Sequence, residues 1–455
     1  MNSHPPTPPA RGALSRRSLV RGGLAAGGLG LVAGTSGCGS ALSAGLVGSE
    51  LAPGTTQFWN LFGGGDGARM IQMEDEYRKQ QGSEKSLEAA TFAWGNPYYS
   101  KVTLATLGNK PPDVAVSHAT RAANLAEAGL LSPITDEVLA AGGLTADSFT
   151  EKAWESVKVD GVPYALPLDT HPWVVFYNTE VLDKAGLVDS DGKLKPIEGT
   201  DGWEAAMTAA KEASGQWGMT TGSVGDNSNC WRMVNTLYFQ TTGAPEFLSD
   251  QGTRLSYDEG ILHDVLVLIR SWAEKGLMPS NADTAGAESS MFTGKSGFFL
   301  NGEWEVTTAQ GIEGLTFGMA AFPTLYDEPA AHADSHTFIL PKMDRDEDRL
   351  KRAMGFVKSM LDQSMTWAAG GHIPAYAETF NSSEYENLEP MHDYAEAANY
   401  AKYDSPAWYS GSGSNFENVI GSEIGLVIQG LSKPEAALAS IKSQLGSYAK
   451  TANPL

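Results

Sequence analysis

Cysteine is scarce in this sequence: only Cys38 and Cys230 occur in 455 residues. Two cysteines cannot supply a disulfide framework, so the fold must be held together by its hydrophobic core. The sequence assigns no histidine and acidic partner to Cys230, and a lone cysteine of this kind is typical of a small buried apolar side chain. We therefore expect Cys230 to be structural and not a nucleophile.

Positive charge is also scarce, with 32 lysines and arginines against 54 acidic residues and a net charge of −22. Nucleic acids and anionic lipid surfaces attract basic proteins, so this balance argues against both as partners. The 42% share of hydrophobic residues and the 11 tryptophans exclude a disordered chain. The length predicts two or three domains.

The N-terminal region lacks acidic residues and a run of apolar residues long enough to cross a bilayer. Its apolar stretch, "LAAGGLGLVAG", is too short and too rich in glycine to span a membrane. It follows the basic segment "SRRSLVRGG" and precedes "TSGCGS", which is the layout of an export signal. The pair Arg16-Arg17 resembles a twin-arginine signal.

The segment "TSGC" resembles the lipobox of bacterial lipoproteins, in which the cysteine is cut free and acylated. We therefore predict a signal peptide over 1–37, lipidation of Cys38, and a flexible, glycine-rich tether over 38–54. This reading places the protein outside the cytoplasm, anchored to the cell membrane. Thr35 departs from the leucine preferred there, so an ordinary thiol in the leader of a secreted protein is the alternative.

Recognisable catalytic and metal-binding patterns are missing. The sequence contains no H-E-x-x-H and no G-x-S-x-G motif. Glu303 and Glu305 would point to different sides of a helical turn, which makes them a poor glycosidase pair. The stretch "DSDGK" over 189–193 has its glycine too early for a calcium loop and is predicted to be a turn. We expect no catalysis, no cofactor and no metal.

The stretch "QFWNLFGGGDGARM" over 57–70 has the order of strand, glycine loop and helix that binds dinucleotides. Asp66 would set a carboxylate where a pyrophosphate needs bare backbone amides, which argues against that ligand. A carboxylate does suit an uncharged polyol, because it accepts strong hydrogen bonds from hydroxyls. We favour contact with a neutral ligand over a plain structural turn.

Hydrophobic patterning predicts an α/β protein. Strand-like and helix-like segments alternate through the first part of the mature chain, which predicts a parallel sheet covered by helices. The stretch 157–168 reads as a hairpin with Asp160-Gly161 at the turn. A second run starts with the strand "PWVVFYN" (172–178), and Ile261, Val265, Leu268, Ile269 and Trp272 form one apolar helix face assigned to the core. Helices are expected to fill most of 344–369 and 387–452.

Several segments together resemble the extracellular solute-binding proteins of bacterial ABC importers, in the group that binds sugars and oligosaccharides such as maltose. The similarity runs through nearly the whole mature chain, with each motif loose. The segments that carry it are "FWNLFGGGDG", "KVTLATLGNKPPDVAVSHATRAANLAEAGLLSPIT", "GVPYALPLDTHPWVVFYNTEVLDKAGL", "FFLNGEW" and "GGHIPAY".

This resemblance implies a two-lobed periplasmic-binding-protein (Venus flytrap) fold with discontinuous lobes and three crossovers. Lobe 1 would comprise 55–168 and 336–372, and lobe 2 would comprise 169–335 and 373–455. A ligand would be held in the cleft between the lobes, which is also where a binding site is expected on general grounds.

The resemblance also nominates ligand-binding residues by matching family positions. The main candidates are polar side chains in the ligand-facing loops and crossover, and aromatic side chains that would stack on a sugar ring: Asp66, His118, Arg121, Asp169, His171, Trp231, Trp304 and Trp408. Weaker candidates lie near the first two strands: Trp59, Asn60, Trp94 and Tyr98. Most of the tryptophans must belong to the core.

The sequence thus predicts a monomeric, lipid-anchored receptor that captures a neutral mono- or oligosaccharide and passes it to the permease subunits of an ABC importer. The alternative is an exported carbohydrate-active enzyme, a glycoside hydrolase or lyase with the same aromatic-rich groove.

Overall fold

The computed structural model of the chain describes residues 54–454. The predicted signal peptide, Cys38 and nearly all of the predicted tether lie outside the described residues. Within the described part of the chain, no helix has both the length and the apolar character needed to cross a membrane.

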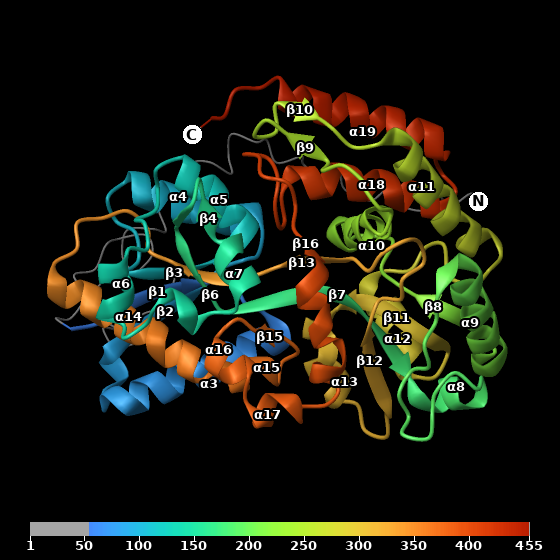
Figure 1. Cartoon of the computed structure of the whole chain (residues 1–455), viewed down its shortest axis with the longest axis horizontal. Helices are drawn as coiled ribbons and strands as arrows, with labels where there is room; N and C mark the ends of the chain where they lie inside the picture. The colour runs from blue at the N-terminus through green and yellow to red at the C-terminus, as the bar shows by residue number, and fades with distance from the viewer. Residues whose placement is uncertain (1–53, 455) are drawn as a thin grey trace, which may run out of the picture. The chain divides into compact units, whose positions relative to one another are not determined.

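The first sheet has five strands in the order β2-β1-β3-β14-β6. Strands β1, β2, β3 and β6 are labelled in Figure 1. Strand β1 is parallel to β2 and β3, whereas β14 is antiparallel to β3 and β6. The predicted parallel core is confirmed, and two later segments extend it as a mixed sheet. The bounds are β1 Thr56–Asn60, β2 Leu87–Thr91, β3 Val114–His118, β6 Ala165–Pro167 and β14 His336–Ile339.

Helices cover the first sheet because their apolar residues recur at helical spacing. In α3 (Gly64–Gln81), Met70, Met73 and Tyr77 are buried on one face. The helix carries Asp66 in its first turn and ends at Gly82 in the left-handed conformation, as the dipole and the C-cap favour. The other helices here are α4 Asn96–Leu107, α5 Ala119–Glu127, α6 Asp136–Ala141, α7 Glu151–Ser156, α14 Glu347–Asp362 and α15 Ser364–Ala368.

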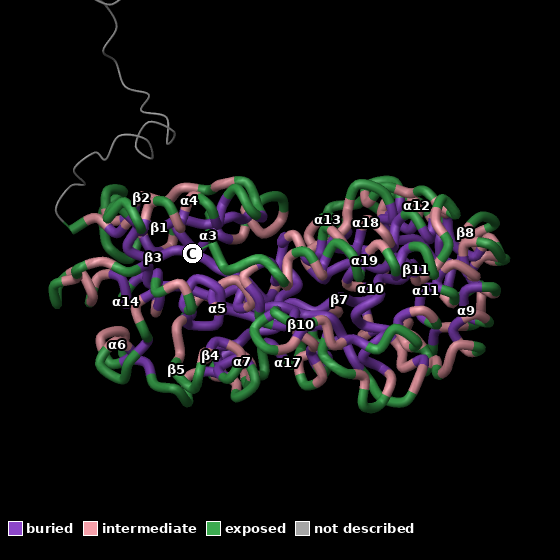
Figure 2. The backbone as a smooth tube through the Cα atoms, turned by 90° about the horizontal axis from the view of Figure 1, so that it is seen from above, coloured by how far each residue is buried: buried purple, intermediate pink, exposed green. Residues whose placement is uncertain are grey.

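The second sheet is built around β7 (Asp169–Asn178), which is buried along its whole length (Figure 2). Trp173, Val175 and Tyr177 face one hydrophobic core, and Val174 and Phe176 face another. Burial on both faces explains why the run 172–177 within this strand is continuously apolar. The strands around it are β8 Trp217–Thr220, β11 Ser296–Gly302, β12 Phe317–Ala321, β13 Ala331–Asp334, β15 Ile373–Pro374 and β16 Ala401–Lys402.

Long helices enclose the larger core of the second sheet, and α10, α11, α18 and α19 pack together there (Figure 1). In α11 the buried face comprises Leu262, Val265, Leu266, Ile269 and Trp272. Trp272 is in the core as predicted, whereas Ile261 and Leu268 lie at its margin. The bounds are α8 Thr179–Lys184, α9 Gly199–Ser214, α10 Asn227–Phe239, α11 Glu259–Glu274, α12 Thr284–Phe292, α18 Asn415–Gln429 and α19 Pro434–Ala449.

Local turn predictions are confirmed, and helices fill most of 387–452 as predicted, with a break at 401–414. Strands β4 (Lys158–Val159) and β5 (Val162–Pro163) pair across Asp160 and Gly161, which both have positive φ. The stretch 189–193 is a turn in which the Asp189 side chain accepts hydrogen bonds from two backbone amides. Residues 401–414 are not helical, because Pro406 and the run "GSGS" interrupt the predicted helix.

The chain passes between the two sheets three times. It leaves β6 for β7 at Leu168, returns from β13 to β14 at Ser335, and leaves α15 for β15 before Ile373. Strand pairing sets these passages side by side, since Asp334 of β13 lies opposite His171 and Pro374 of β15 lies opposite Asp169. Side chains on the three passages are therefore brought together.

Candidate functional site

A pocket of about 280 Å³ opens where the two sheets meet. The first sheet and its loops contribute residues that follow β1, β2 and β3 or begin β14. The second sheet contributes His171 of β7, Trp304 after β11, and two residues at the start of α10. The lining residues are Leu61, Phe62, Gly63, Asp66, Trp94, His118, His171, Asp226, Arg232, Trp304 and His336.

Five of the predicted site residues line this pocket: Asp66, Trp94, His118, His171 and Trp304. They are separated by up to 238 positions in the sequence, and the fold gathers them on both sides of one space. Trp94 is 43% exposed and therefore has indole surface free for a ligand. Their roles in ligand binding stay predictions.

Asp169 lies behind the pocket and is completely buried. Its carboxylate accepts hydrogen bonds from His171 Nδ1 (3.1 Å), His336 N and Nδ1 (2.7 Å each) and Trp367 Nε1 (2.6 Å). Burial opposes its charge, but the facing rings of His336, His372 and His171 hold its pKa well below the usual range. Asp169 thus orients two pocket histidines and does not line the pocket.

His171 and His336 are both held through Nδ1, which leaves Nε2 as the ring nitrogen on the pocket side. Burial and the neighbouring His336 lower the pKa of His171 to about 3, so this imidazole is neutral. Because its Nδ1–H donates to Asp169, its Nε2 is a hydrogen-bond acceptor. The two rings stack with centroids 4.1 Å apart.

His118 is positioned by Tyr99, whose hydroxyl lies 2.7 Å from Nδ1 and accepts a hydrogen bond from the His118 amide at 3.0 Å. When that hydroxyl donates to Nδ1, both groups are satisfied and Nε2–H remains for the pocket. Burial lowers the pKa of His118 well below its usual value, which keeps the ring neutral. The predicted Arg121 stacks on Tyr99 at 4.3 Å, one layer behind the pocket.

His372 connects the pocket to the passages between the sheets. Its Nε2 lies 3.0 Å from Asp66 Oδ1, and its Nδ1 lies 3.2 Å from Asp169 Oδ2 and 3.0 Å from Glu303 Oε1. Burial disfavours charge on the ring, but Asp66 and Asp169 raise its pKa well above the usual value. Burial also raises the pKa of Glu303 to about 8. His372 therefore favours a positive charge among these carboxyl groups.

The glycine run at the start of α3 permits a close approach between the two halves of the site. Gly64 has φ +55, and a Cβ on Gly65 would come within 2.8 Å of the Thr307 side chain. The run therefore serves packing as well as placing Asp66 at the pocket. Contact of this loop with a neutral ligand remains a prediction.

Trp304 folds back over the strand that precedes it. A Cβ on Gly302 would lie 1.9 Å from the indole ring, so only glycine fits beneath it. The Arg232 guanidinium stacks on the indole at 4.9 Å and joins it to α10. The sequence "NGEW" thus places an aromatic wall at the pocket.

We expect Gly302→Ala to lower the free energy of unfolding by about 1–3 kcal/mol, because the added methyl group must displace the Trp304 ring. Chemical denaturation monitored by circular dichroism measures this change. Gly355→Ala is the matched control, since a Cβ there meets nothing within 4 Å and the site lies within helix α14. That control should be neutral or stabilising by up to about 1 kcal/mol; equal effects for both variants would contradict the tight fit of Gly302.

Several nominated residues do not line this pocket. Trp231 is fully buried in the core of the second sheet, where its Nε1 donates to Asp404 at 2.8 Å. Trp408 packs on Tyr409 and Tyr448, away from the pocket. The weaker candidates Trp59, Asn60 and Tyr98 are buried within the first sheet and its helices. The sequence around these residues is compatible with packing in the core as well as with contact to a ligand.

Sequence reasoning missed Asp226, Arg232, His336 and His372. Asp226 caps α10 through a bond to the Asn229 amide and also lines the pocket. His336 lies in "ADSH" and His372 in "GGHIPAY", each next to a passage between the sheets. The segment "GGHIPAY" is part of the family resemblance, so its match to the family could have identified His372 as a candidate.

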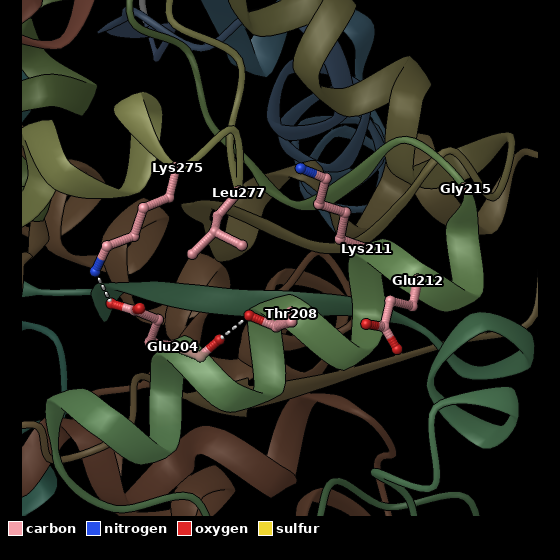
Figure 3. A pocket seen from close by; sticks show the side chains of 7 residues that line it. All are labelled: Glu204, Thr208, Lys211, Glu212, Gly215, Lys275 and Leu277. Carbon is pink, nitrogen blue, oxygen red and sulfur yellow. Dashed lines mark hydrogen bonds and ion pairs between the residues drawn. The ribbon is translucent and has the colours of Figure 1, made fainter.

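A second hollow, of about 440 Å³, lies on the outer surface of α9 (Figure 3). Its lining is mostly charged, and Lys275 already pairs with Glu204 at 2.6 Å. It offers no aromatic side chain and lies on one side of the second sheet only. We assign it no ligand.

Comparisons with known proteins agree with this architecture. The family model described as "Bacterial extracellular solute-binding protein" matches residues 73–399. A search of curated proteins found no match.

Solved structures with the same fold cover most of the chain. The GacH receptor of Streptomyces glaucescens is 17% identical with a TM-score of 0.70, covering 87% of this chain and 98% of its own. The sugar-binding protein MalE of Xanthomonas citri is 17% identical with a TM-score of 0.70, and the match covers 87% of this chain and 97% of MalE. The substrate-binding protein Lmo0181 of Listeria monocytogenes is 18% identical with a TM-score of 0.70, and the match covers 87% of this chain and 98% of Lmo0181. At these identities the likeness establishes the fold, which is the predicted two-lobed α/β class.

Proposed function

The chain belongs to the family of bacterial extracellular solute-binding proteins, which are receptors and not enzymes, and from this premise we propose that it captures a carbohydrate for an ABC importer. The receptor holds a mono- or short oligosaccharide in the pocket between the sheets and delivers it to the permease subunits. A lipid on Cys38 and the tether that follows keep it at the outer face of the cell membrane.

The observation that carries this proposal is the pairing of aromatic walls with hydrogen-bonding groups in one pocket. A sugar ring has an apolar C–H face and a rim of hydroxyls. Trp94 and Trp304 supply indole surface for the face, and Asp66, Asp226 and the acceptor nitrogen of His171 accept hydrogen bonds from the rim. Arg232 adds a donor for ligand oxygens.

The ligands named for structural relatives support a carbohydrate. The GacH receptor is described in complex with acarbose, and Lmo0181 in complex with cycloalternan. A cyclo/maltodextrin-binding protein is described in complex with maltotetraose. The pocket volume of about 280 Å³ lies near the lower end of the range for small-molecule sites, about 300–1,000 Å³. We therefore favour a shorter saccharide than maltotetraose for this chain.

The pocket lining also suggests how binding is signalled. Asp66, Trp94 and His118 come from the first sheet, whereas His171, Arg232 and Trp304 come from the second. A ligand that contacts both groups stabilises the arrangement in which they are close, and so shifts the population toward a closed receptor. The permease would then distinguish the loaded receptor from the empty one by shape.

We expect a thermal-shift screen of the full chain to show stabilisation by one or a few mono- or oligosaccharides. At 100 times the dissociation constant, the gain in unfolding free energy is about 2.7 kcal/mol, because the ligand binds only the folded state. Amino acids, spermidine and inorganic phosphate serve as the comparison set. Stabilisation by one of these, with no saccharide effective, would contradict the carbohydrate assignment.

A further inference from the structure

The three passages between the sheets bring Asp169, His171, His336 and His372 into one buried cluster. Each of the four side chains is at most 6% exposed. One candidate ligand atom from each lies within 4.8 Å of the others. The cluster borders the pocket, because His171 and His336 also line it.

The spacing inside the cluster is that of neighbouring ligands on one metal ion. The Nδ1 atoms of His171, His336 and His372 lie 3.1, 2.7 and 3.2 Å from oxygens of the Asp169 carboxylate. Ligands placed about 2.0–2.2 Å from a common ion, in octahedral or tetrahedral arrangement, are separated by about 2.8–3.6 Å. The 3.1 and 3.2 Å distances fall within this range, and the 2.7 Å distance would lengthen slightly when an ion is bound. Glu303 Oε1 lies 3.0 Å from His372 Nδ1 and could complete the set.

Two members of this group carry buried polar atoms that have no hydrogen-bond partner. His372 Nδ1 and both carboxyl oxygens of Glu303 make no hydrogen bond, although both side chains are completely buried. The short distance between them is therefore a contact with poor alignment and not a hydrogen bond. Buried polar atoms normally find partners, and an ion between these groups would satisfy them together.

Asp169 is oriented by hydrogen bonds from neighbouring groups, as the carboxylate ligands of metal ions usually are. Trp367 Nε1 and the His336 amide donate to its carboxylate and fix its orientation independently of the imidazoles. The rings of His171 and His336 stack with 25° between their planes, so one ring must tilt before both lone pairs meet at one point. The alternative is a closed network in which the imidazoles only donate hydrogen bonds to Asp169.

We propose that Asp169, His171, His336 and His372 bind one divalent transition-metal ion at the base of the pocket, with Glu303 as an additional ligand. Three imidazoles and a carboxylate suit Zn²⁺ and similar ions, whereas Mg²⁺ and Ca²⁺ prefer oxygen ligands alone. With the ion bound at Nδ1, the neutral imidazole of His171 would carry its proton on Nε2, and Nε2 would then donate to the pocket in place of accepting from it. This inference departs from the expectation from the sequence and does not depend on the identity of the sugar.

The test begins with the full chain, stripped of metal by a chelator and titrated with Zn²⁺ in a calorimeter. We expect one tight site per chain, with Ca²⁺ and Mg²⁺ producing no comparable heat. Co²⁺ as a spectroscopic probe should give visible absorption of a nitrogen- and oxygen-ligated ion. Absence of stoichiometric Zn²⁺ uptake by this unmodified protein would overturn the proposal, and this result requires no variant to fold.

Substitutions of the proposed ligands test whether the ion binds at this cluster. Changes in groups that merely support a metal ligand already cost about 10–100-fold in affinity, so His336→Gln and His372→Gln should each weaken Zn²⁺ binding at least about 100-fold. His332→Gln is the matched control, since His332 is equally buried beside Asp404 and Glu417 in a separate cluster. Zn²⁺ binding that survives His336→Gln and His372→Gln but is lost in His332→Gln would overturn the assignment.

Discussion

Replacing Asp169 with asparagine should lower the free energy of unfolding of the metal-free protein by about 3–5 kcal/mol, because it breaks a buried charged network from one side. The carboxylate accepts four hydrogen bonds from His171, His336 and Trp367. An amide replaces one acceptor oxygen by an NH₂ group that must face a donor. Denaturation in the presence of a chelator, monitored by circular dichroism, measures the loss.

Asp191→Asn is the control for this prediction. Asp191 is exposed in the turn over 189–193, and its loss should change stability by no more than about 0.5 kcal/mol. An Asp169→Asn protein as stable as the Asp191→Asn protein would show that the buried carboxylate does not hold the three passages together.

Replacing Trp304 with alanine should weaken binding of the identified saccharide about 30- to 1,000-fold. Removing a tryptophan from the centre of a binding site costs about 2–4 kcal/mol, and each 1.4 kcal/mol is a factor of ten in affinity. Here the change removes the aromatic wall and leaves Arg232 without the ring on which it stacks. Isothermal titration with the sugar found in the thermal-shift screen provides the measurement.

Trp408→Ala separates loss of the site from general damage to the fold. Trp408 is partly buried against Tyr409 and Tyr448 and does not line the pocket. Its loss should reduce stability while leaving sugar affinity within about threefold, since no contact to the ligand is removed. If Trp408→Ala abolished binding and Trp304→Ala did not, the assignment of the pocket would be wrong.

The elements of the fold were largely predictable because their signals are local. The turn at Asp160-Gly161 is determined by residues within a four-residue stretch. The buried face of α11 is determined by the spacing of apolar residues within that one helix. The mixed order of the first sheet was not predictable in this way. Strand β14 joins β3 across more than 200 positions, and nothing in the sequence of either strand fixes that pairing.

The lining of the pocket was predictable at or just after the ends of strands at the pocket edge, as with Asp66, His118 and Trp304. It was not predictable where the contribution depends on strand register. His336 meets Asp169 only because β14 begins immediately after the second passage between the sheets. Trp231 shows the converse limit: an aromatic residue in a helix start has the same local pattern whether it faces a ligand or the core.

Small-angle scattering of the full chain, with and without the saccharide that stabilises it most, tests the central claim most directly. Because the ligand would contact Asp66, Trp94 and His118 from the first sheet and His171, Arg232 and Trp304 from the second, binding should close the two halves. The expected result is a smaller radius of gyration in the bound protein and no change for Trp304→Ala at the same sugar concentration. Saturating sugar that leaves the radius of gyration of the unmodified protein unchanged would contradict capture between the two sheets.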